Sequence, residues 1–199
     1  MTRGRSGTAI RGAAPMRQRS FLLECTPDTF QARASQTNGL RTIPANPRDA
    51  VRCKRLWSAV GAGFWTERSR WDRARWREHL QQPDVSFFIA LASDEDAGCF
   101  ESTRSARGVK IQGFGLLPPY RGRGLGRDLL TAATERAFAA GARKVWLHTA
   151  TDDHPNALPN YLSGGYRIVR ERKLANPMPP QRTTGLARWR STQSKASRV

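Results

Sequence analysis

The segment that most constrains the fold of this chain is the glycine-rich loop Arg121-Gly122-Arg123-Gly124-Leu125-Gly126, which separates a strand-like stretch from a helix-like one. Glycines let the backbone approach an anion, and the free N–H groups and dipole of a following helix favour negative charge there. The loop lacks the Lys of a nucleotide P-loop, and Arg127 stands where a dinucleotide-binding loop has its third glycine. It predicts an anion site of another kind; the alternative is a tight turn that needs glycine only for its backbone.

Apolar periodicity and turn residues on both sides of the loop predict an alternation of strands and helices. Several strands followed by helix, strand, helix and strand predict an α/β fold with a mixed sheet flanked by helices. Phe21–Gln36 shows no clear pattern and is expected to be a lead-in. The predicted elements are a strand at Leu40–Ile43, a helix at Asp49–Val60, a helix that Asp72 caps and that stops by Pro83, strands at Phe87–Leu91, Cys99–Thr103 and Val109–Leu117, a helix at Gly126–Ala140, a strand at Lys144–Ala150, a short helix at Asn156–Ser163 and a last strand at Tyr166–Arg170.

The chain of 199 residues carries a formal charge of +18, which by itself suggests nucleic acid or an anionic surface as a partner. More than half of this excess lies in residues 1–20 and 176–199, which hold ten basic residues and no acidic one. We expect these two segments to be disordered extensions and residues 21–175 to be one domain. Met16 is a possible alternative start. No nucleic-acid-binding motif accompanies the charge, so nucleic acid is not the expected partner.

Cysteine usage and hydropathy indicate the expected compartment. Cys25, Cys53 and Cys99 are widely spaced and include no C-x-x-C pair, which argues against a disulfide framework and against a zinc site. The N-terminal segment has no apolar core of a secretory signal, and no apolar run approaches the ~18–20 residues needed to span a bilayer. The expectation is a cytoplasmic protein with no membrane contact and no metal.

Read with its flanks, the loop resembles a known family. Gly113-Phe114-Gly115-Leu116-Leu117-Pro118, followed by Arg121-x-x-Gly124-x-Gly126, is similar to the acetyl-CoA signature of the GNAT N-acetyltransferases. Downstream, Leu147-His148-Thr149 and then Asp153-His154-Pro155-x-Ala157-Leu158-x-x-Tyr161-x-x-x-Gly165-Tyr166 resembles the second half of that domain, in a subgroup with a D-H-P-x-A-L-x-x-Y-x-x-x-G-[FY] ending. The resemblance is strong over residues 87–171.

The resemblance implies a mostly antiparallel sheet whose fourth and fifth strands, Val109–Leu117 and Lys144–Ala150, splay apart to admit the pantetheine arm of acetyl-CoA. It implies that the backbone of a bulge near Leu116 and Leu117 pairs with the pantetheine amides. The pyrophosphate would be held by the N–H groups of the loop, with arginines beside it. The implied cofactor-binding residues are Leu116, Leu117, Arg121, Gly122, Arg123, Gly124, Leu125, Gly126 and His154.

The resemblance also implies direct attack of a substrate amine on the thioester, so no nucleophilic Cys or Ser is needed. Tyr161 is then the candidate general acid for the leaving thiolate; the alternative is an aromatic packing residue. His154 either contacts coenzyme A or caps the entry to the last helix. Glu101 is the candidate general base, through water, and its alternative is a salt bridge with a nearby arginine.

Two positions depart from the subgroup. Lys110 stands where a glutamate is usual, and Gly113 stands where an aromatic residue commonly precedes Phe114. A lysine would repel a cationic substrate, so the class of acceptor is open. The four tryptophans between positions 57 and 76 are expected to lie over the acceptor side, more as packing than as a cage for a cation.

The predicted function is N-acetyl transfer from acetyl-CoA, as cosubstrate, to the primary amine of a small molecule or of a peptide or protein. The alternatives are a degenerate GNAT domain that binds acyl-CoA without turnover, and, less favoured, a basic nucleic-acid-binding protein. The expected assembly is a monomer or a homodimer.

Overall fold

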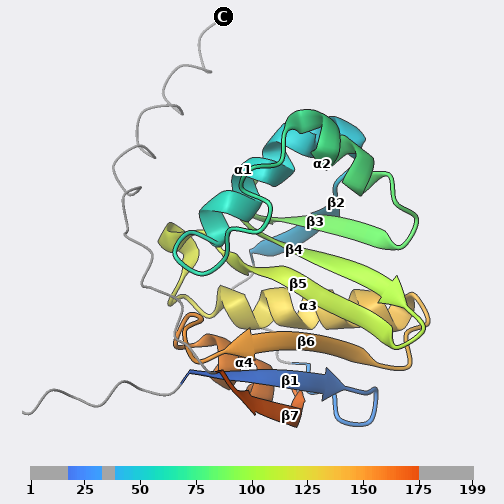
Figure 1. Ribbon diagram of the computed structural model, residues 1–199, viewed down its shortest axis with the longest axis vertical. Coiled ribbons are helices and arrows are strands. Elements are labelled where there is room, and N and C mark those ends of the chain that lie inside the picture. The colour runs from blue at the N-terminus through green and yellow to red at the C-terminus, as the bar shows by residue number, and fades with distance from the viewer. Residues whose placement is uncertain (1–17, 33–38, 175–199) are drawn as a thin grey trace, which may run out of the picture.

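The computed structural model describes residues 18–32 and 39–174. The predicted extensions, 1–20 and 176–199, lie outside these residues except for Gln18, Arg19 and Ser20. The elements in chain order (Figure 1) are β1 (Arg19–Cys25), β2 (Leu40–Pro44), α1 (Ala50–Val60), α2 (Arg73–Leu80), β3 (Val85–Ala92), β4 (Glu95–Ser105), β5 (Gly108–Leu116), α3 (Leu125–Ala139), β6 (Val145–Ala150), α4 (Ala157–Ser163) and β7 (Arg167–Lys173).

The strands form one seven-stranded sheet in the order β2-β3-β4-β5-β6-β1-β7. Every neighbouring pair is antiparallel except β5 and β6, which run parallel. The parallel pair requires a crossover connection, which α3 supplies on one face of the sheet. The predicted mixed, mostly antiparallel sheet flanked by helices is confirmed.

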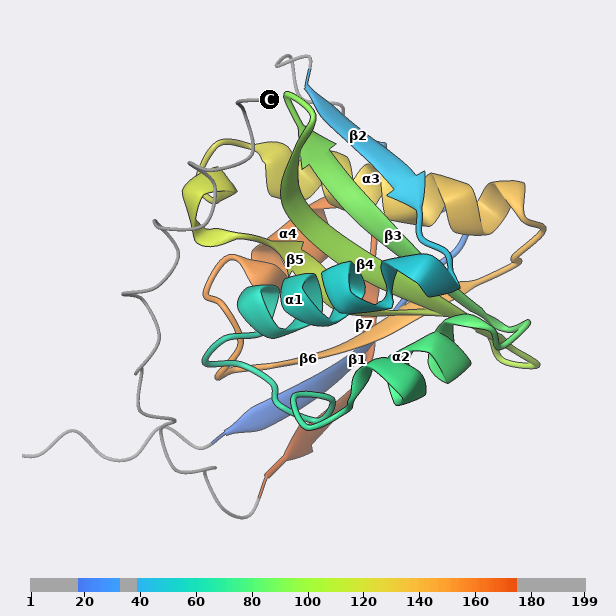
Figure 2. The same ribbon diagram turned by 90° about the horizontal axis from the view of Figure 1, so that it is seen from above.

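The helices cover the two faces of the sheet separately, with α1 and α2 on one face and α3 and α4 on the other (Figure 2). Each face has its own core. One core joins α1 and α2 to β3 and β4 through Trp57, Trp76 and Phe87. The other joins α3 and α4 to β1 and β6 through Leu129 and Leu147.

Sequence periodicity explains the helices. On α1 the apolar face that the sequence predicts, formed by Cys53, Leu56, Trp57 and Val60, is buried. The carboxylate of Asp72 caps α2, because its Oδ1 accepts a hydrogen bond from the Arg75 N–H at 2.8 Å. The predicted apolar stripe of α3, Leu130, Ala133 and Ala137, is also buried.

Two sequence predictions of the fold were wrong. The unpatterned lead-in contains β1, which inserts between β6 and β7. Its consecutive Phe21, Leu22 and Leu23 are all buried, so this strand shows no alternation of apolar and polar residues there. The turn predicted at 94–98 is a two-residue turn at Ser93 and Asp94, which have φ of 50° and 63°, so β4 begins four residues earlier than expected.

No helix within the described ranges is long and apolar enough to cross a membrane.

Candidate active site

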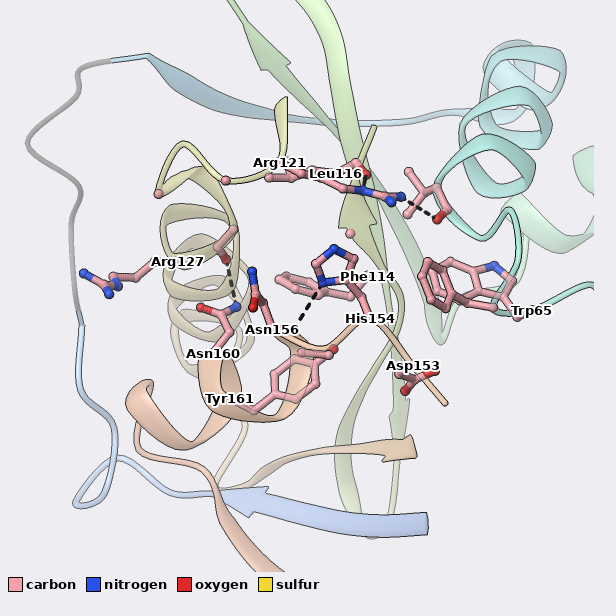
Figure 3. Close-up of a pocket in the computed structure, with 17 residues that line it drawn as sticks. Trp65, Phe114, Leu116, Arg121, Arg127, Asp153, His154, Asn156, Asn160 and Tyr161 are labelled. Atoms are coloured by element: carbon pink, nitrogen blue, oxygen red, sulfur yellow. Dashed lines mark hydrogen bonds between the residues drawn. The ribbon is translucent and has the colours of Figure 1, made fainter. Parts of the chain in front are cut away.

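Strands β5 and β6 separate at one end, as the sequence resemblance implies. They pair only through Val109–Val145 and Lys110–Trp146. Beyond this pair lies a cavity of about 340 Å³, lined by the last residues of β5, the loop that leads into α3, the loop after β6, α4 and the segment after α1 (Figure 3). Its size is within the ordinary range for small-molecule sites.

The glycine-rich loop forms one wall of this cavity. Gly122 and Gly124 have φ of 74° and 81°, in the left-handed region that disfavours other residues, and Gly124 is the N-cap of α3. The backbone N–H groups from Gly122 to Gly126 donate to no acceptor among the described residues. They lie at the positive end of a fifteen-residue helix. This wall therefore suits an anion such as a pyrophosphate.

Arg121 and Arg127 line the same wall in different ways. The Arg121 guanidinium donates from Nε to the Leu116 carbonyl at 2.9 Å and from Nη2 to the Val60 carbonyl at 3.3 Å. It thereby joins the end of β5 to the end of α1 and brings a half-buried charge to the cavity. Arg127 follows on the first turn of α3 and forms no ion pair within the described residues.

A β-bulge interrupts β5 at Gly113 and Phe114, because Cys99 pairs with Gly115 while Glu101 pairs with Gln112. The bulge lies two residues before the position near Leu116 and Leu117 that the resemblance implied. Gly113 has φ of 54°, and a Cβ there would lie 1.9 Å from the Trp57 ring. Trp57 thus fills the space beside Gly113, which explains why this chain has no side chain there.

Tyr161, on α4, is almost fully buried and lines the cavity next to Phe114, with ring centroids 5.8 Å apart. Its hydroxyl forms no hydrogen bond within the described residues. Figure 3 shows the ring directed from α4 into the cavity. Burial raises the pKa of Tyr161, and the neighbouring carboxylate of Asp153 raises it further. The phenol therefore stays protonated at neutral pH and is able to donate its proton.

Asp153 brings a carboxylate to the cavity. Its Oδ2 accepts hydrogen bonds from Thr149 Oγ1 at 2.6 Å and from the Ala150 N–H at 3.0 Å. Its Oδ1 has no partner within the described residues. Burial raises the pKa of Asp153 and outweighs the opposing effect of these hydrogen bonds, so the group is a stronger base than an ordinary aspartate.

His154 lines the cavity and also shapes the entry to α4. Its Nδ1 accepts a hydrogen bond from the Asn156 N–H at 3.2 Å, and its ring packs edge-on against Phe64. This hydrogen bond supports the capping role of His154 at the entry to α4. Because His154 also lines the cavity, both alternatives for this residue agree with the structure. Asn160, one turn further on, donates to the Gly126 carbonyl at 3.1 Å and ties α4 to the glycine-rich loop.

Glu101, the predicted general base, is fully buried and does not line the cavity. Its carboxylate accepts hydrogen bonds from Arg68 at 2.6 and 3.0 Å, and His79 Nε2 lies 2.8 Å away. Burial alone would raise the pKa of Glu101, but the hydrogen bonds from His79 and Arg68 and the charge of Arg68 lower it to about 2. The structure thus favours the salt-bridge alternative, because such a carboxylate is a poor proton acceptor.

The tryptophans of this region surround Arg68. Its guanidinium lies 4.2 Å from the Trp57 ring centroid and 4.9 Å from that of Trp71. The expectation that the tryptophans pack, and form no open cage for a ligand, agrees with this arrangement, since the chain's own arginine fills the space between them.

Most of the predicted residues gather at the cavity. Those that line it are Leu116, Arg121, Gly122, Gly124, Gly126, His154 and Tyr161. The side chains of Leu117 and Leu125 belong to the two cores instead, and Arg123 is exposed outside the lining. The Leu117 N–H is also already bonded to the Ala97 carbonyl at 2.8 Å.

The sequence reasoning missed other lining residues. Phe64 and Trp65 come from an irregular segment after α1, where no periodic pattern points to them. Asp153, Asn156 and Asn160 stand inside the motif that the sequence singled out, and the polar side chains of that motif were a usable signal.

Comparison with known proteins agrees with this architecture. Residues 51–165 match the Acetyltransferase (GNAT) family. A mycothiol acetyltransferase from Corynebacterium aurimucosum is 46% identical over 57 residues, which are 29% of this chain and 18% of that protein.

Two solved structures share the fold. A GCN5-related N-acetyltransferase from Kribbella flavida has a TM-score of 0.56 and 21% identity, with 76% of this chain and 56% of that chain covered. An aminoglycoside acetyltransferase from an uncultured soil metagenomic sample, solved with trehalose, has a TM-score of 0.57 and 19% identity, with 72% and 97% covered. Since the family match spans more than half of the sequence, this chain belongs to the GNAT family of acetyltransferases.

Proposed function

We propose that the protein transfers the acetyl group of acetyl-CoA to a primary amine by direct attack. The observation that carries this proposal is one cavity that brings together the backbone N–H groups from Gly122 to Gly126 and the hydroxyl of Tyr161, none of which has a hydrogen-bond partner in the part of the chain that the structure describes. The wall suits the phosphates of coenzyme A, and the hydroxyl is a proton donor for a leaving thiolate.

The residues present fit acetyl-CoA. Gly122 and Gly126 place no side chain between the backbone and a ligand, and an added Cβ at Gly122 would meet no protein atom within 4 Å. Arg121 and Arg127 supply positive charge beside the N–H groups. Bound acetyl-CoA supplies an activated thioester, and these residues bind its phosphates and orient it along the gap between β5 and β6.

Proton transfer is assigned to two side chains of the cavity. As the amine nitrogen forms its bond to the acetyl carbon and the carbon–sulfur bond breaks, Tyr161 donates its proton to the sulfur. Asp153 accepts the proton that the amine loses, through Oδ1. The products are an N-acetylated amine and free coenzyme A, and solvent restores both protonation states.

A covalent acetyl-cysteine step is not part of this proposal. All three cysteines are buried, and burial raises the pKa of each thiol, that of Cys53 to about 12. Thiols of this kind carry almost no thiolate at neutral pH and are poor nucleophiles.

The experiment that tests the function has two parts. Calorimetry should show saturable acetyl-CoA binding at low salt, and a thiol-release assay should show free coenzyme A only when an amine is added. Binding without release across polyamines, aminoglycosides, amino acids and peptides would instead support the acyl-CoA-binding alternative. Steeply salt-dependent binding of nucleic acid, without acetyl-CoA binding, would support the third alternative.

A further inference from the structure

Among the described residues, no helix covers β6, β1 and β7 on the sheet face that carries α1 and α2, and we call this part of the face its open half. Helices α1 and α2 pack on β3, β4 and β5 and lie away from β6, β1 and β7 (Figure 1). The open half begins at the last pair of β5 and β6, Lys110 and Trp146, where the strands begin to separate.

The strand register shows which side chains share this open half. Trp146 pairs with Glu24, so both lie on the face of Lys110. One step along, His148 pairs with Leu22, and Leu22 pairs with Arg170. In the next step on that face, Ala150 and Arg172 both pair with Ser20. Residues directly opposite across strands point to the same side of a sheet.

The face is therefore strongly basic. Lys110, Arg170 and Arg172 form no ion pair within the described residues. The carboxylate on the face, that of Glu24, is already bound by Arg107 at 2.9 Å and Lys144 at 3.2 Å. The carboxylate of β7, that of Glu171, pairs with Arg19 on the opposite face.

The basic groups lie around His148, which is one strand away from Lys110 and two strands away from Arg170 and Arg172. Burial lowers the pKa of His148, and the charges of Lys110, Arg107, Arg172 and Arg170 lower it further. Trp146 holds two of them close, since the Arg107 guanidinium and the Lys110 ammonium lie 4.7 and 5.6 Å from its ring centroid. An anion at this point would meet several cations without displacing an existing partner.

This point is within reach of the cavity. Lys110 is four residues before Phe114, which lines the cavity, and strands rise about 3.3 Å per residue, so the separation is on the order of 10 Å. Acidic groups near Lys110 are Glu101, which Arg68 neutralises, and Glu67, on the exposed segment between α1 and α2. An acceptor that enters from this face thus passes a mainly positive surface.

We propose that the acceptor is an amine that also carries an anionic group, a carboxylate or a phosphate, on the order of 10 Å from its nitrogen. The amine reaches the cavity beside Tyr161, and the anionic group binds on the open half of the sheet among Lys110, Arg170 and Arg172. This inference rests on the proposed function and names the class of its acceptor.

Matched ligands separate charge from size. Triglycine and its C-terminal amide differ in one carboxylate, and 6-aminohexyl phosphate and 6-aminohexanol differ in one phosphate. The binding of each ligand to the protein saturated with coenzyme A, where no turnover occurs, is measured by calorimetry. The anionic member of at least one pair should bind about tenfold more tightly at low salt, and the difference should shrink as salt shortens the screening length. The two pairs distinguish a carboxylate from a phosphate as the preferred group.

The double variant Arg170→Glu and Arg172→Glu should abolish this preference. Lys173→Glu is the matched control, because Lys173 is on the same strand and pairs with Arg19 on the opposite face. The control should keep the preference. Both changes are at exposed positions, so neither is expected to unfold the protein.

Equal binding within both pairs, no binding of any anionic member, or a preference that the double variant retains would overturn the inference. A preference for the anionic member without coenzyme A release would support the anion site and contradict the proposed transfer function. The two failures are therefore distinguishable.

Discussion

The Arg68 guanidinium donates two hydrogen bonds to the Glu101 carboxylate, from Nη1 to Oε2 at 2.6 Å and from Nη2 to Oε1 at 3.0 Å. The carboxylate is fully buried, and the side chain of Arg68 is only 11% exposed. This ion pair fastens the segment between α1 and α2 to β4. Glu101, which the sequence predicts as a general base, therefore has a structural role in the fold.

Glu101→Gln should lower the free energy of unfolding by about 3–5 kcal/mol, because the change leaves the buried charge of Arg68 without its partner. Urea denaturation measures this loss. Glu135→Gln on the exposed side of α3 is the control and should change stability by less than about 0.5 kcal/mol. A Glu101→Gln protein of unchanged stability would show that the ion pair contributes little.

The pH dependence of the free energy of unfolding should also show the contribution of the Arg68–Glu101 ion pair. The pKa of Glu101 is lowered from 4.5 in the unfolded chain to about 2 in the folded one, so its contribution is complete above 4.5 and is lost as the pH falls towards 2. The stability difference between the wild type and Glu101→Gln should therefore narrow over that window. A difference that stays constant between pH 5 and pH 2 would contradict the assignment.

Tyr161→Phe should reduce kcat about 100-fold, since the leaving thiolate loses its proton donor, and should leave acetyl-CoA affinity nearly unchanged. Steady-state kinetics and calorimetry separate these effects. Tyr166→Phe is the matched control: it removes a buried hydroxyl that lies 2.8 Å from Thr134 Oγ1, so it should cost about 1 kcal/mol of stability with little effect on kcat. A similar kcat for Tyr161→Phe and the wild type would contradict the role of Tyr161 as proton donor and support the alternative that it is a packing residue.

Gly122→Ala and Gly141→Ala form a second matched pair. Both glycines have positive φ, 74° and 83°, and an added Cβ would touch no protein atom at either site. The backbone strain should therefore destabilise both variants similarly, by about 1 kcal/mol. Only Gly122 lines the cavity, so only Gly122→Ala should weaken acetyl-CoA binding, by tenfold or more. Equal effects of the two changes on acetyl-CoA binding would contradict the proposed binding of phosphates by the N–H groups from Gly122 to Gly126.

Asp153→Asn tests the proton acceptor. If Asp153 accepts the amine proton, kcat/KM of the wild type should rise with pH through the pKa of Asp153, which burial raises, and then level off below the pKa of the amine. The variant should lose this acid limb and be at least tenfold slower. A variant with an unchanged pH profile would show that water alone removes the proton.

The fold was largely predictable because its strongest signals are local. The stripes of α1 and α3 and the Asp72 cap follow from spacing alone. Strand β1 was not predictable in this way, since its burial depends on two strands, β6 and β7, that come more than 100 residues later.

The candidate site divides along the same line. Gly122, Gly124 and Tyr161 stand in the two sequence motifs that resemble the family, and all three line the cavity. The role of Glu101 was not predictable, because it depends on an ion pair with Arg68, which is 33 residues away in an irregular segment. No local sequence pattern indicates that contact. The need for glycine at position 113 of the bulge was not predictable for the same reason, because it depends on the Trp57 ring, which comes from helix α1.

The most direct test of the central claim is a single-turnover experiment with acetyl-CoA and an excess of triglycine, quenched early and analysed by mass spectrometry of the small molecules and of the intact protein. Direct transfer predicts N-acetyl-triglycine and free coenzyme A in equal amounts, with no acetylated protein at any time, and a much slower reaction for Tyr161→Phe. An acetylated protein that forms before the product, or coenzyme A released with free acetate and no N-acetyl product, would contradict the account.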